Sequence, residues 1–394
     1  MTTWIPMFAL PHLDVQEAIE VEGMAVVTLR DERLKVLAKR HRRFAMYMRR
    51  FKTEFGQQIW PSVLIREASS PEQYRSVEAL AGFRDAIAIS VIPYSWALAL
   101  RFENTFGIRY ANWFSFYPWM VDAKYDGLIM QSMAQFGYHE VKSLKAQTAA
   151  GFSYQPLSER MIDKPLLKAL LERWVARFKT DTPGRENVAL FRSLNMALSA
   201  AMLPGNVEVT IYDIGKAIAL WVSAFEILAH PGSNVGFRQV YELLEKPKWN
   251  LSECCELQYE PYGYKQGQPK RSLPVWLYGE LNRARNDFLH GNPISGRRLI
   301  VPPGKQALHL YAAPLFRMAL TAFLKLTMDR RPPRENETDF EAFLAYEHQF
   351  GGYQRDIEAA IATILFTKEE YRAVRTGRAS RARRISRERR AKSP

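Results

Sequence analysis

The spacing of apolar side chains separates a mixed first part of the chain from a helical remainder. Ile19–Leu29 alternates and then becomes apolar, which predicts a strand, whereas Asp31–Phe55 and Ser70–Ile89 show helical spacing. Tyr110–Trp119, with the sequence YANWFSFYPW, is rich in aromatic residues and alternates, which favours a strand or a hairpin. These segments predict an α/β domain over residues 1–150.

From Lys164 onward, apolar residues recur three and four positions apart, as on the buried face of a helix. We expect a helical connector over 151–184, a helical domain over 185–330 and further helices over 331–371. The expected helices are Asn187–Met202, Val209–Ala229, Phe237–Glu245, Val275–Leu289 and Gln306–Met328, with shorter amphipathic pieces near Asp339–Phe350 and Gln354–Thr367. The predicted fold class is therefore α+β and predominantly helical.

The positive charge of the chain is concentrated at its end. The 394 residues carry a net charge of +14, and residues 372–394 contribute ten Lys or Arg against a single acid. So polar a segment has too few apolar residues to bury, and we expect a disordered tail that contacts phosphates or merely keeps the protein in solution. The arginines expected to bind nucleic acid are Arg378, Arg381, Arg384, Arg387 and Arg390.

A second basic segment, Arg30–Lys52, carries eleven Lys, Arg or His residues interleaved with apolar ones such as Phe44 and Met48. It suits a helix that binds nucleic acid or a membrane surface. It equally suits a solvated basic face over a stripe of core residues, and we expect the second arrangement.

The compartment follows from the cysteines and the apolar runs. Cys254 and Cys255 are adjacent, a spacing that does not suit a disulfide, which favours a reducing cytoplasm. The N-terminus lacks the basic start of a signal peptide and is interrupted by proline. The longest apolar runs, such as Ala217–Ala229, contain Glu226 and are too short to span a bilayer. We expect a cytoplasmic protein with no membrane insertion.

The sequence shows no sign of a bound cofactor or metal ion. The histidines lack the two-His or Cys/His spacing of a metal site, and Cys254 and Cys255 lie between acids that should not activate a thiolate. No glycine-rich phosphate loop is present. We therefore expect no cofactor and no metal.

The stretch LNRARNDFLHGNPISG, Leu281–Gly296, carries the strongest candidate chemistry. Helical spacing predicts a helix that ends at Gly291, so His290 lies in the last turn, where the helix dipole favours a protonated imidazole. Arg285 and His290 are five residues apart and diverge by roughly 140° on an ideal helix, although a long arginine can still reach the same cleft. From spacing alone, an ordinary polar helix end is the expected interpretation.

These groups also suit RNA cleavage. His290 can take a proton from a ribose 2′-hydroxyl or give one to the leaving 5′-oxygen. Arg285 can hold the scissile phosphate and stabilise the charge of the transition state, and Asn286 can orient either group. That route needs no metal ion.

The motif RNDFLHG, Arg285–Gly291, resembles the signature of the HEPN superfamily, and IGKAIALWVSAFEIL resembles the second helix of its Apea-like group. The resemblance covers roughly Arg185–Arg330 and implies a four-helix bundle, usually dimeric, in which the motifs of two protomers face each other. Many members are metal-independent endoribonucleases in toxin–antitoxin, CRISPR-linked or phage-defence systems. Arg285, Asn286 and His290 carry over as catalytic residues. Glu226 matches a glutamate of the second helix, where it could support the site or equally orient Arg285 as a structural pair.

The resemblance leads us to expect an antiviral or toxin ribonuclease that acts on RNA as a homodimer. Its first 150 residues would sense a trigger or bind a regulatory partner. The alternative is a catalytically silent bundle that binds nucleic acid or dimerises. One departure from the family is the long insertion His230–Leu273 between the second and third helices, which could cover the cleft or change the dimer surface.

Overall fold

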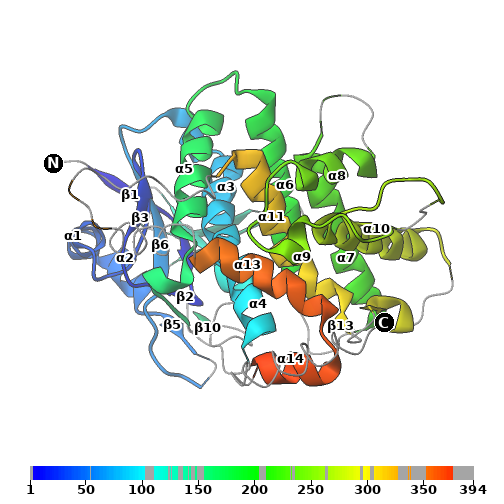
Figure 1. Cartoon of the computed structure of the whole chain (residues 1–394). Helices are drawn as coiled ribbons and strands as arrows, with labels where there is room; N and C mark the ends of the chain where they lie inside the picture. The colour runs from blue at the N-terminus through cyan, green and yellow to red at the C-terminus, as the bar shows by residue number, and fades with distance from the viewer. Residues whose placement is uncertain are drawn as a thin grey trace. The chain divides into compact units, whose positions relative to one another are not determined.

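The chain forms two compact units, each assembled from separate segments and traced in Figure 1. The computed structural model describes residues 3–375, with gaps at 54, 103–110, 123–124, 126, 132–135, 141, 143–146, 149–154, 204–209, 231, 233–235, 262–264, 293–295, 302–305, 327–335, 337 and 339–351. Unit 1 comprises Met1–Ala88, Tyr110–Ile162 and Leu170–Asn187, and unit 2 comprises Ile89–Arg109, Asp163–Ala169 and Val188–Pro394.

Unit 1 contains an antiparallel sheet with the strand order β1-β6-β4-β3. The strands are β1 (Trp4–Leu10), β6 (Ser62–Glu67), β4 (Met24–Val27) and β3 (Ile19–Val21). The sequence predicts a single strand over Ile19–Leu29, which is wrong because β3 and β4 form a hairpin. Glu22 and Gly23 adopt positive φ angles of 32° and 80°, and successive positive φ angles make a tight hairpin turn.

The basic segment Arg30–Lys52 forms two helices and a short strand: α1 (Glu32–Arg40), α2 (Arg42–Met48) and β5 (Phe51–Lys52). The single helix predicted over Asp31–Phe55 is interrupted at His41, which takes an extended conformation with φ −117° and ψ 93°. Phe44 and Met48 are buried in the core of unit 1, while most of the basic side chains are exposed. The expected basic face over a stripe of core residues is confirmed.

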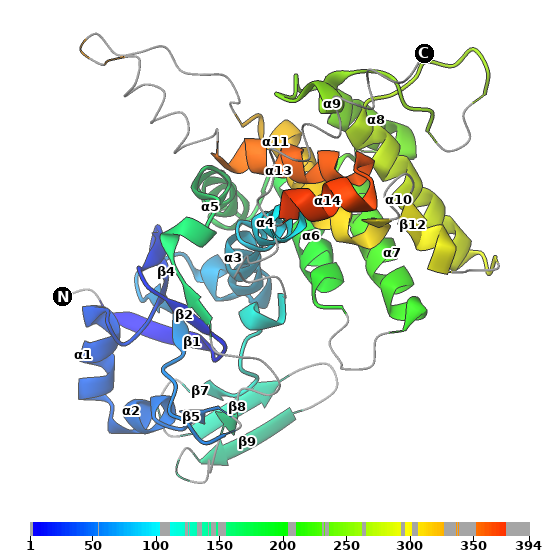
Figure 2. The ribbon, with the colours of Figure 1, turned by 60° about the horizontal axis from the view of Figure 1, so that its bottom comes forward.

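The aromatic segment Tyr110–Trp119 is neither a strand nor a hairpin in its described residues, and that prediction is wrong. It begins with a 3₁₀ turn, η2 (Ala111–Phe114), in which Trp113 and Phe114 are buried. The alternation of aromatic residues therefore reflects burial and not the period of a strand. A separate antiparallel sheet follows and is visible in Figure 2: β7 (Met120–Val121), β8 (Gly127–Gln131) and β9 (Phe136–Glu140).

Helices complete unit 1. The helix expected over Ser70–Ile89 begins as a 3₁₀ turn, η1 (Glu72–Arg75), and continues as α3 (Val77–Ile89). Trp174, on α5 (Lys164–Phe178), is fully buried and donates its indole N–H to the carbonyl of Ala79 at 2.8 Å. The remaining short elements are β2 (Leu13–Val15), β10 (Gln147–Thr148), β11 (Gln155–Leu157) and η4 (Glu159–Met161).

Unit 2 is mainly helical. Its helices are α4 (Ile92–Arg101), α6 (Arg185–Ala201), α7 (Ile211–Leu228), α8 (Phe237–Glu245), α9 (Ser252–Cys255), α10 (Leu273–Leu289), α11 (Ala312–Leu324), α13 (Gly352–Ala362) and α14 (Lys368–Arg375). The short elements are η5 (Gly296–Leu299), β12 (Ile300–Val301), β13 (Gln306–Ala307), η6 (Leu308–Tyr311) and η8 (Thr363–Leu365). The helix predicted over Gln306–Met328 thus starts later, and the piece predicted near Asp339–Phe350 lies outside the described residues. The chain is a mixed α+β protein with a predominance of helix.

Helix α11 is the centre of unit 2. Every residue from Ala312 to Ala322 is buried, and α4, α7, α8 and α13 all pack against this helix. The segment Val77–Arg101, which spans α3 and α4, is the one described segment long and apolar enough to cross a membrane. However, 72% of its most apolar window is buried inside the protein, as is usual for core helices.

A chain of buried polar side chains joins distant segments of unit 2. The Arg317 Nε donates to Asp163 Oδ2 at 2.6 Å, and the two residues are 2% and 0% exposed. Arg317 also donates to Thr321 and to Gln354 Oε1, the latter at 3.1 Å. Gln354 in turn donates to Glu358 Oε1 at 2.9 Å.

Glu358 ends this network at the loop before α9. Its Oε2 accepts the backbone N–H groups of Asn250 and Leu251, both at 2.8 Å, and its Oε1 accepts the Asn250 side chain at 3.1 Å. Burial raises the pKa of Glu358 despite these hydrogen bonds. The network therefore connects the start of α5, helices α11 and α13, and the start of α9.

We expect the Arg317→Met substitution to destabilise unit 2 by about 3–5 kcal/mol, because the Asp163 carboxylate would stay buried without its cation. Urea unfolding measures the loss. Arg75→Met is the control, since its ion pair with Glu72 is exposed and should contribute less than about 1 kcal/mol. A loss as small as that of the control would show that Arg317 does not hold unit 2 together.

Candidate active site

The C-terminal end of α10 presents the motif that the sequence analysis identifies. His290 is the C-cap residue of α10, and its backbone N–H donates to the Asn286 carbonyl at 3.0 Å. Gly291 follows with φ 69°, and the Asn292 N–H donates back to the Asp287 carbonyl at 3.1 Å. This is the Schellman arrangement that commonly ends helices, so the predicted helix end at Gly291 is confirmed.

Arg285 is held between two neighbours. Its Nη2 lies 3.8 Å from Glu226 Oε2 on α7, and its Nη1 donates to Asn286 Oδ1 at 3.2 Å. The Arg285 and Glu226 side chains are 28% and 23% exposed, so the ion pair is partly shielded from water. The structure thus brings Glu226, Arg285 and Asn286 together, from two helices that pack side by side.

His290 is exposed and stands apart from this pair. Within the described part of the chain, no hydrogen bond or ion pair joins its side chain to Arg285. The separation agrees with the divergence of about 140° that five residues produce on an α-helix. One copy of α10 therefore supplies an anchored cation and, one turn later, an accessible imidazole.

Two further residues of this region are not identified by the sequence analysis. Tyr278 and Asn282 precede Arg285 by seven and three positions, so all three lie on one face of α10. The Tyr278 hydroxyl, Asn282 Oδ1 and Arg285 Nε are buried, and none has a hydrogen-bond partner in the described structure. Helical spacing back from Arg285 is the signal that could have found these residues.

Burial controls the protonation of the groups behind Arg285. It raises the pKa of Glu226, which the positive charge of Arg285 lowers in part. Burial likewise raises the pKa of Tyr278 well above its usual value, with a smaller contribution from the negative charge of Glu226. The Tyr278 ring packs edge-on against Phe225 at 5.3 Å and against Tyr241 of α8 at 5.9 Å. The hydroxyl of Tyr278 is thus neutral at physiological pH.

Close packing sets the distance between α7 and α10 near the motif. A Cβ atom added at Gly215 of α7 would lie 2.1 Å from Cδ1 of Phe288. Only glycine leaves room for this aromatic ring, two residues before His290 in the chain. The glycine in IGKAIALWVSAFEIL therefore has a packing role.

The other candidates from the sequence have less support. Cys254 is buried and burial raises the pKa of its thiol, as it does for Cys255, so neither is an activated nucleophile. The described residues contain no group of His, Cys, Asp or Glu side chains that could hold a metal ion. Helix α14 extends to Arg375, so the first residues of the expected tail are helical. The remainder of the tail lies outside the described residues, including Arg378, Arg381, Arg384, Arg387 and Arg390.

Comparison with known proteins gives no relative from which to assign the site. No protein-family model, curated protein or solved structure matches the chain.

We expect Gly215→Ala to destabilise the protein, because the new Cβ must displace Phe288. Overpacking typically costs about 1–3 kcal/mol, against a gain of at most about 1 kcal/mol in helix propensity. Thermal unfolding measures the change. Phe288→Leu in the Gly215→Ala background should restore part of the loss, and a variant as stable as the wild type would contradict the close packing.

We expect Glu226→Gln to leave the stability at pH 7 unchanged or to raise it. Burial raises the pKa of Glu226 in the folded protein above its ordinary value of 4.5. The protonated carboxyl therefore contributes its full stabilisation below pH 4.5, and this stabilisation is lost as the pH rises through the folded-state pKa. Glutamine imitates the protonated acid and avoids this loss. Urea unfolding at pH 7 and at pH 4 tests the sign, since the two proteins should converge at the lower pH. A less stable variant at pH 7 would mean that pairing with Arg285 outweighs burial.

Proposed function

We propose that the chain is a metal-independent endoribonuclease of the HEPN type, with Arg285, Asn286 and His290 as its catalytic residues. The observation that carries the proposal is the end of α10, where a guanidinium anchored by Glu226 precedes an exposed histidine by five residues. An ordinary polar helix end requires no such anchoring of its arginine. Arg285 Nε and Asn282 Oδ1 are also buried without hydrogen-bond partners in the described structure, which is unusual for an ordinary polar helix end.

Arg285 would bind the scissile phosphate. A guanidinium offers paired N–H groups that match two phosphate oxygens, and it remains charged at any physiological pH. Glu226 and Asn286 fix the plane of the guanidinium before substrate arrives, which reduces the entropy lost on binding. As negative charge builds up on the phosphorus oxygens, Arg285 would stabilise the transition state more than the ground state.

His290 would move the protons. The ribose 2′-oxygen attacks phosphorus while its proton passes to a base, and the bond to the 5′-oxygen breaks as that oxygen receives a proton from an acid. The products are a 2′,3′-cyclic phosphate and a 5′-hydroxyl. Base and acid are two groups, whereas one copy of the motif contains a single histidine, His290. A homodimer that brings two copies of α10 together would supply both.

The biological role that fits such an activity is antiviral defence or a toxin–antitoxin system. An unregulated ribonuclease would damage its own cell, so unit 1 is the natural place for a trigger or a regulatory partner. This assignment rests on the resemblance of the motif and the order of α6, α7, α10 and α11.

We expect the purified protein to cleave RNA in the presence of EDTA and His290→Ala to reduce the rate by about 10²–10⁴-fold. Gel electrophoresis measures the cleavage, and mass spectrometry identifies the 2′,3′-cyclic phosphate ends. His139→Ala is the control, since His139 is an exposed histidine of unit 1 and should not affect the rate.

Two outcomes would contradict the nuclease. Cleavage that persists unchanged in His290→Ala would show that the activity comes from elsewhere. Wild-type protein that shifts RNA on a gel without cutting it would favour the silent module, and removal of residues 372–394 would then abolish the shift.

A further inference from the structure

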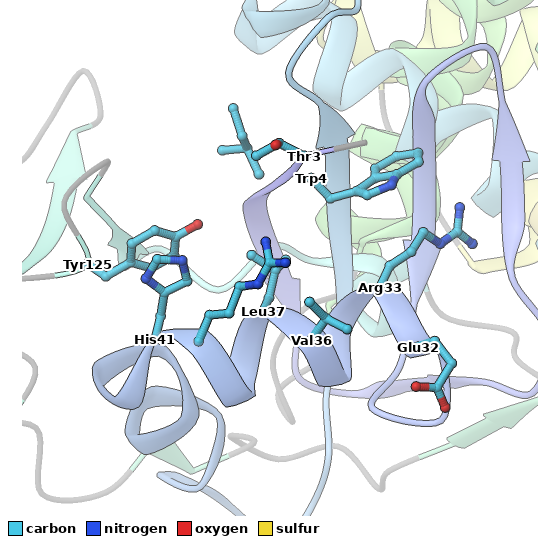
Figure 3. A pocket seen from close by; sticks show the side chains of 10 residues that line it. Thr3, Trp4, Glu32, Arg33, Val36, Leu37, His41 and Tyr125 are labelled. Atoms are coloured by element: carbon cyan, nitrogen blue, oxygen red, sulfur yellow. The ribbon is translucent and has the colours of Figure 1, made fainter. Parts of the chain in front are cut away.

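A cavity of about 520 Å³ lies in unit 1, remote in sequence from the α10 motif (Figure 3). It is lined by the start of β1, by one face of α1, by His41 and by Tyr125. Cavities of roughly 300–1,000 Å³ hold small-molecule ligands in proteins. The size of this one therefore suits a ligand, and its lining indicates which kind.

The two ends of the cavity carry aromatic surfaces. At one end, the rings of His41 and Tyr125 are stacked, with centroids 3.9 Å apart and an angle of 15° between their planes. Tyr125 holds this position with φ 59°, a conformation uncommon for residues other than glycine. At the other end stands Trp4, and Figure 3 shows Val36 and Leu37 between the two ends. Flat apolar surfaces of this kind accept an aromatic ring.

Two arginines, Arg33 and Arg40, line the cavity against one acid, Glu32, and the segment that supplies them is strongly basic. The segment Arg30–Lys52 holds ten Lys or Arg against two acids, Asp31 and Glu32. Both acids are already engaged, Asp31 with Arg33 at 2.8 Å and Glu32 with Lys35 at 2.6 Å. The Arg33 guanidinium also lies 4.8 Å from the centre of the Trp4 ring, which fixes that ring in place. Because Lys and Arg outnumber the acids in this segment, its field attracts a negatively charged ligand.

Arg40 is the basic residue best placed to contact such a ligand. It lines the cavity and is exposed, whereas Arg42 and Lys39 are exposed members of the same segment that do not line it. We propose that this cavity binds a small ligand that combines a flat aromatic ring with a phosphate group, the chemistry of a nucleoside monophosphate. The ring lies on the aromatic surfaces, and Arg40 binds the phosphate.

Isothermal titration calorimetry with the full-length protein tests this site, using the 5′-monophosphates of adenosine, guanosine, cytidine and uridine as probes. At least one should bind with one site per chain. Arg40→Gln should weaken that binding about tenfold or more, as expected for a lost charged hydrogen bond, without changing the weaker binding of the corresponding nucleoside. Arg42→Gln is the matched control and should bind as the wild type does.

Val36→Trp gives a second, independent variant. Val36 lines the cavity and is 42% exposed, so a larger side chain can fill the space without disturbing the core. It should abolish binding of nucleotide and nucleoside alike. The absence of binding by all four probes would overturn the proposal, as would binding that Val36→Trp leaves intact. Equal losses in Arg40→Gln and Arg42→Gln would likewise overturn it, because they indicate general charge attraction. Val36 and Arg40 line this cavity and Arg285 does not, so a loss of binding in the two cavity variants is independent of RNA cleavage.

Discussion

Arg317 is buried in unit 2 with its positive charge. The need to pair this buried charge constrains how the helices of unit 2 are arranged. A buried guanidinium is tolerated only where acceptors surround it, so Asp163, Thr321 and Gln354 must all be in place. Through Gln354 the same network positions Glu358, which holds the backbone before α9. The apolar contacts of α11 supply much of the stabilisation, but the hydrogen-bond directions of these side chains select one arrangement of the helices.

The candidate site depends on this core without being part of it. Helix α7 packs on α11, and α10 packs on α7, so the position of Arg285 is determined by elements that cannot easily move. At the end of α10 the Schellman turn brings His290 out of the packed region. An anchored cation and an accessible imidazole are thus combined because one lies within the helix and the other at its end.

The helices were the most predictable part of the molecule, because apolar residues at three and four spacing mark a buried face whatever it packs against. The end of α10 was predictable for a similar reason, since Gly291 supports the positive φ that its turn requires. Over Tyr110–Trp119 the alternating aromatic residues wrongly predicted a strand. They alternate because some of them are buried, and the segment begins with a 3₁₀ turn. Side-chain pairs that are distant in sequence could not be predicted from local patterns. Asp163 and Arg317, for example, lie 154 residues apart. Within the site, Glu226 was identified, whereas Tyr278 and Asn282 looked like ordinary helix residues.

The place of α13 after α10 and α11 in the chain determines when unit 2 can be completed during synthesis. Glu358 accepts the Asn250 N–H across 108 residues, so this loop lacks its carboxylate acceptor until Glu358 has been translated. Arg317 likewise lacks its acceptor Gln354 until 37 further residues have been translated. A nascent chain therefore carries α7 and α10 for some time before their supporting core is finished. The end of α10 therefore rests on its complete supporting core only after α13 has been translated.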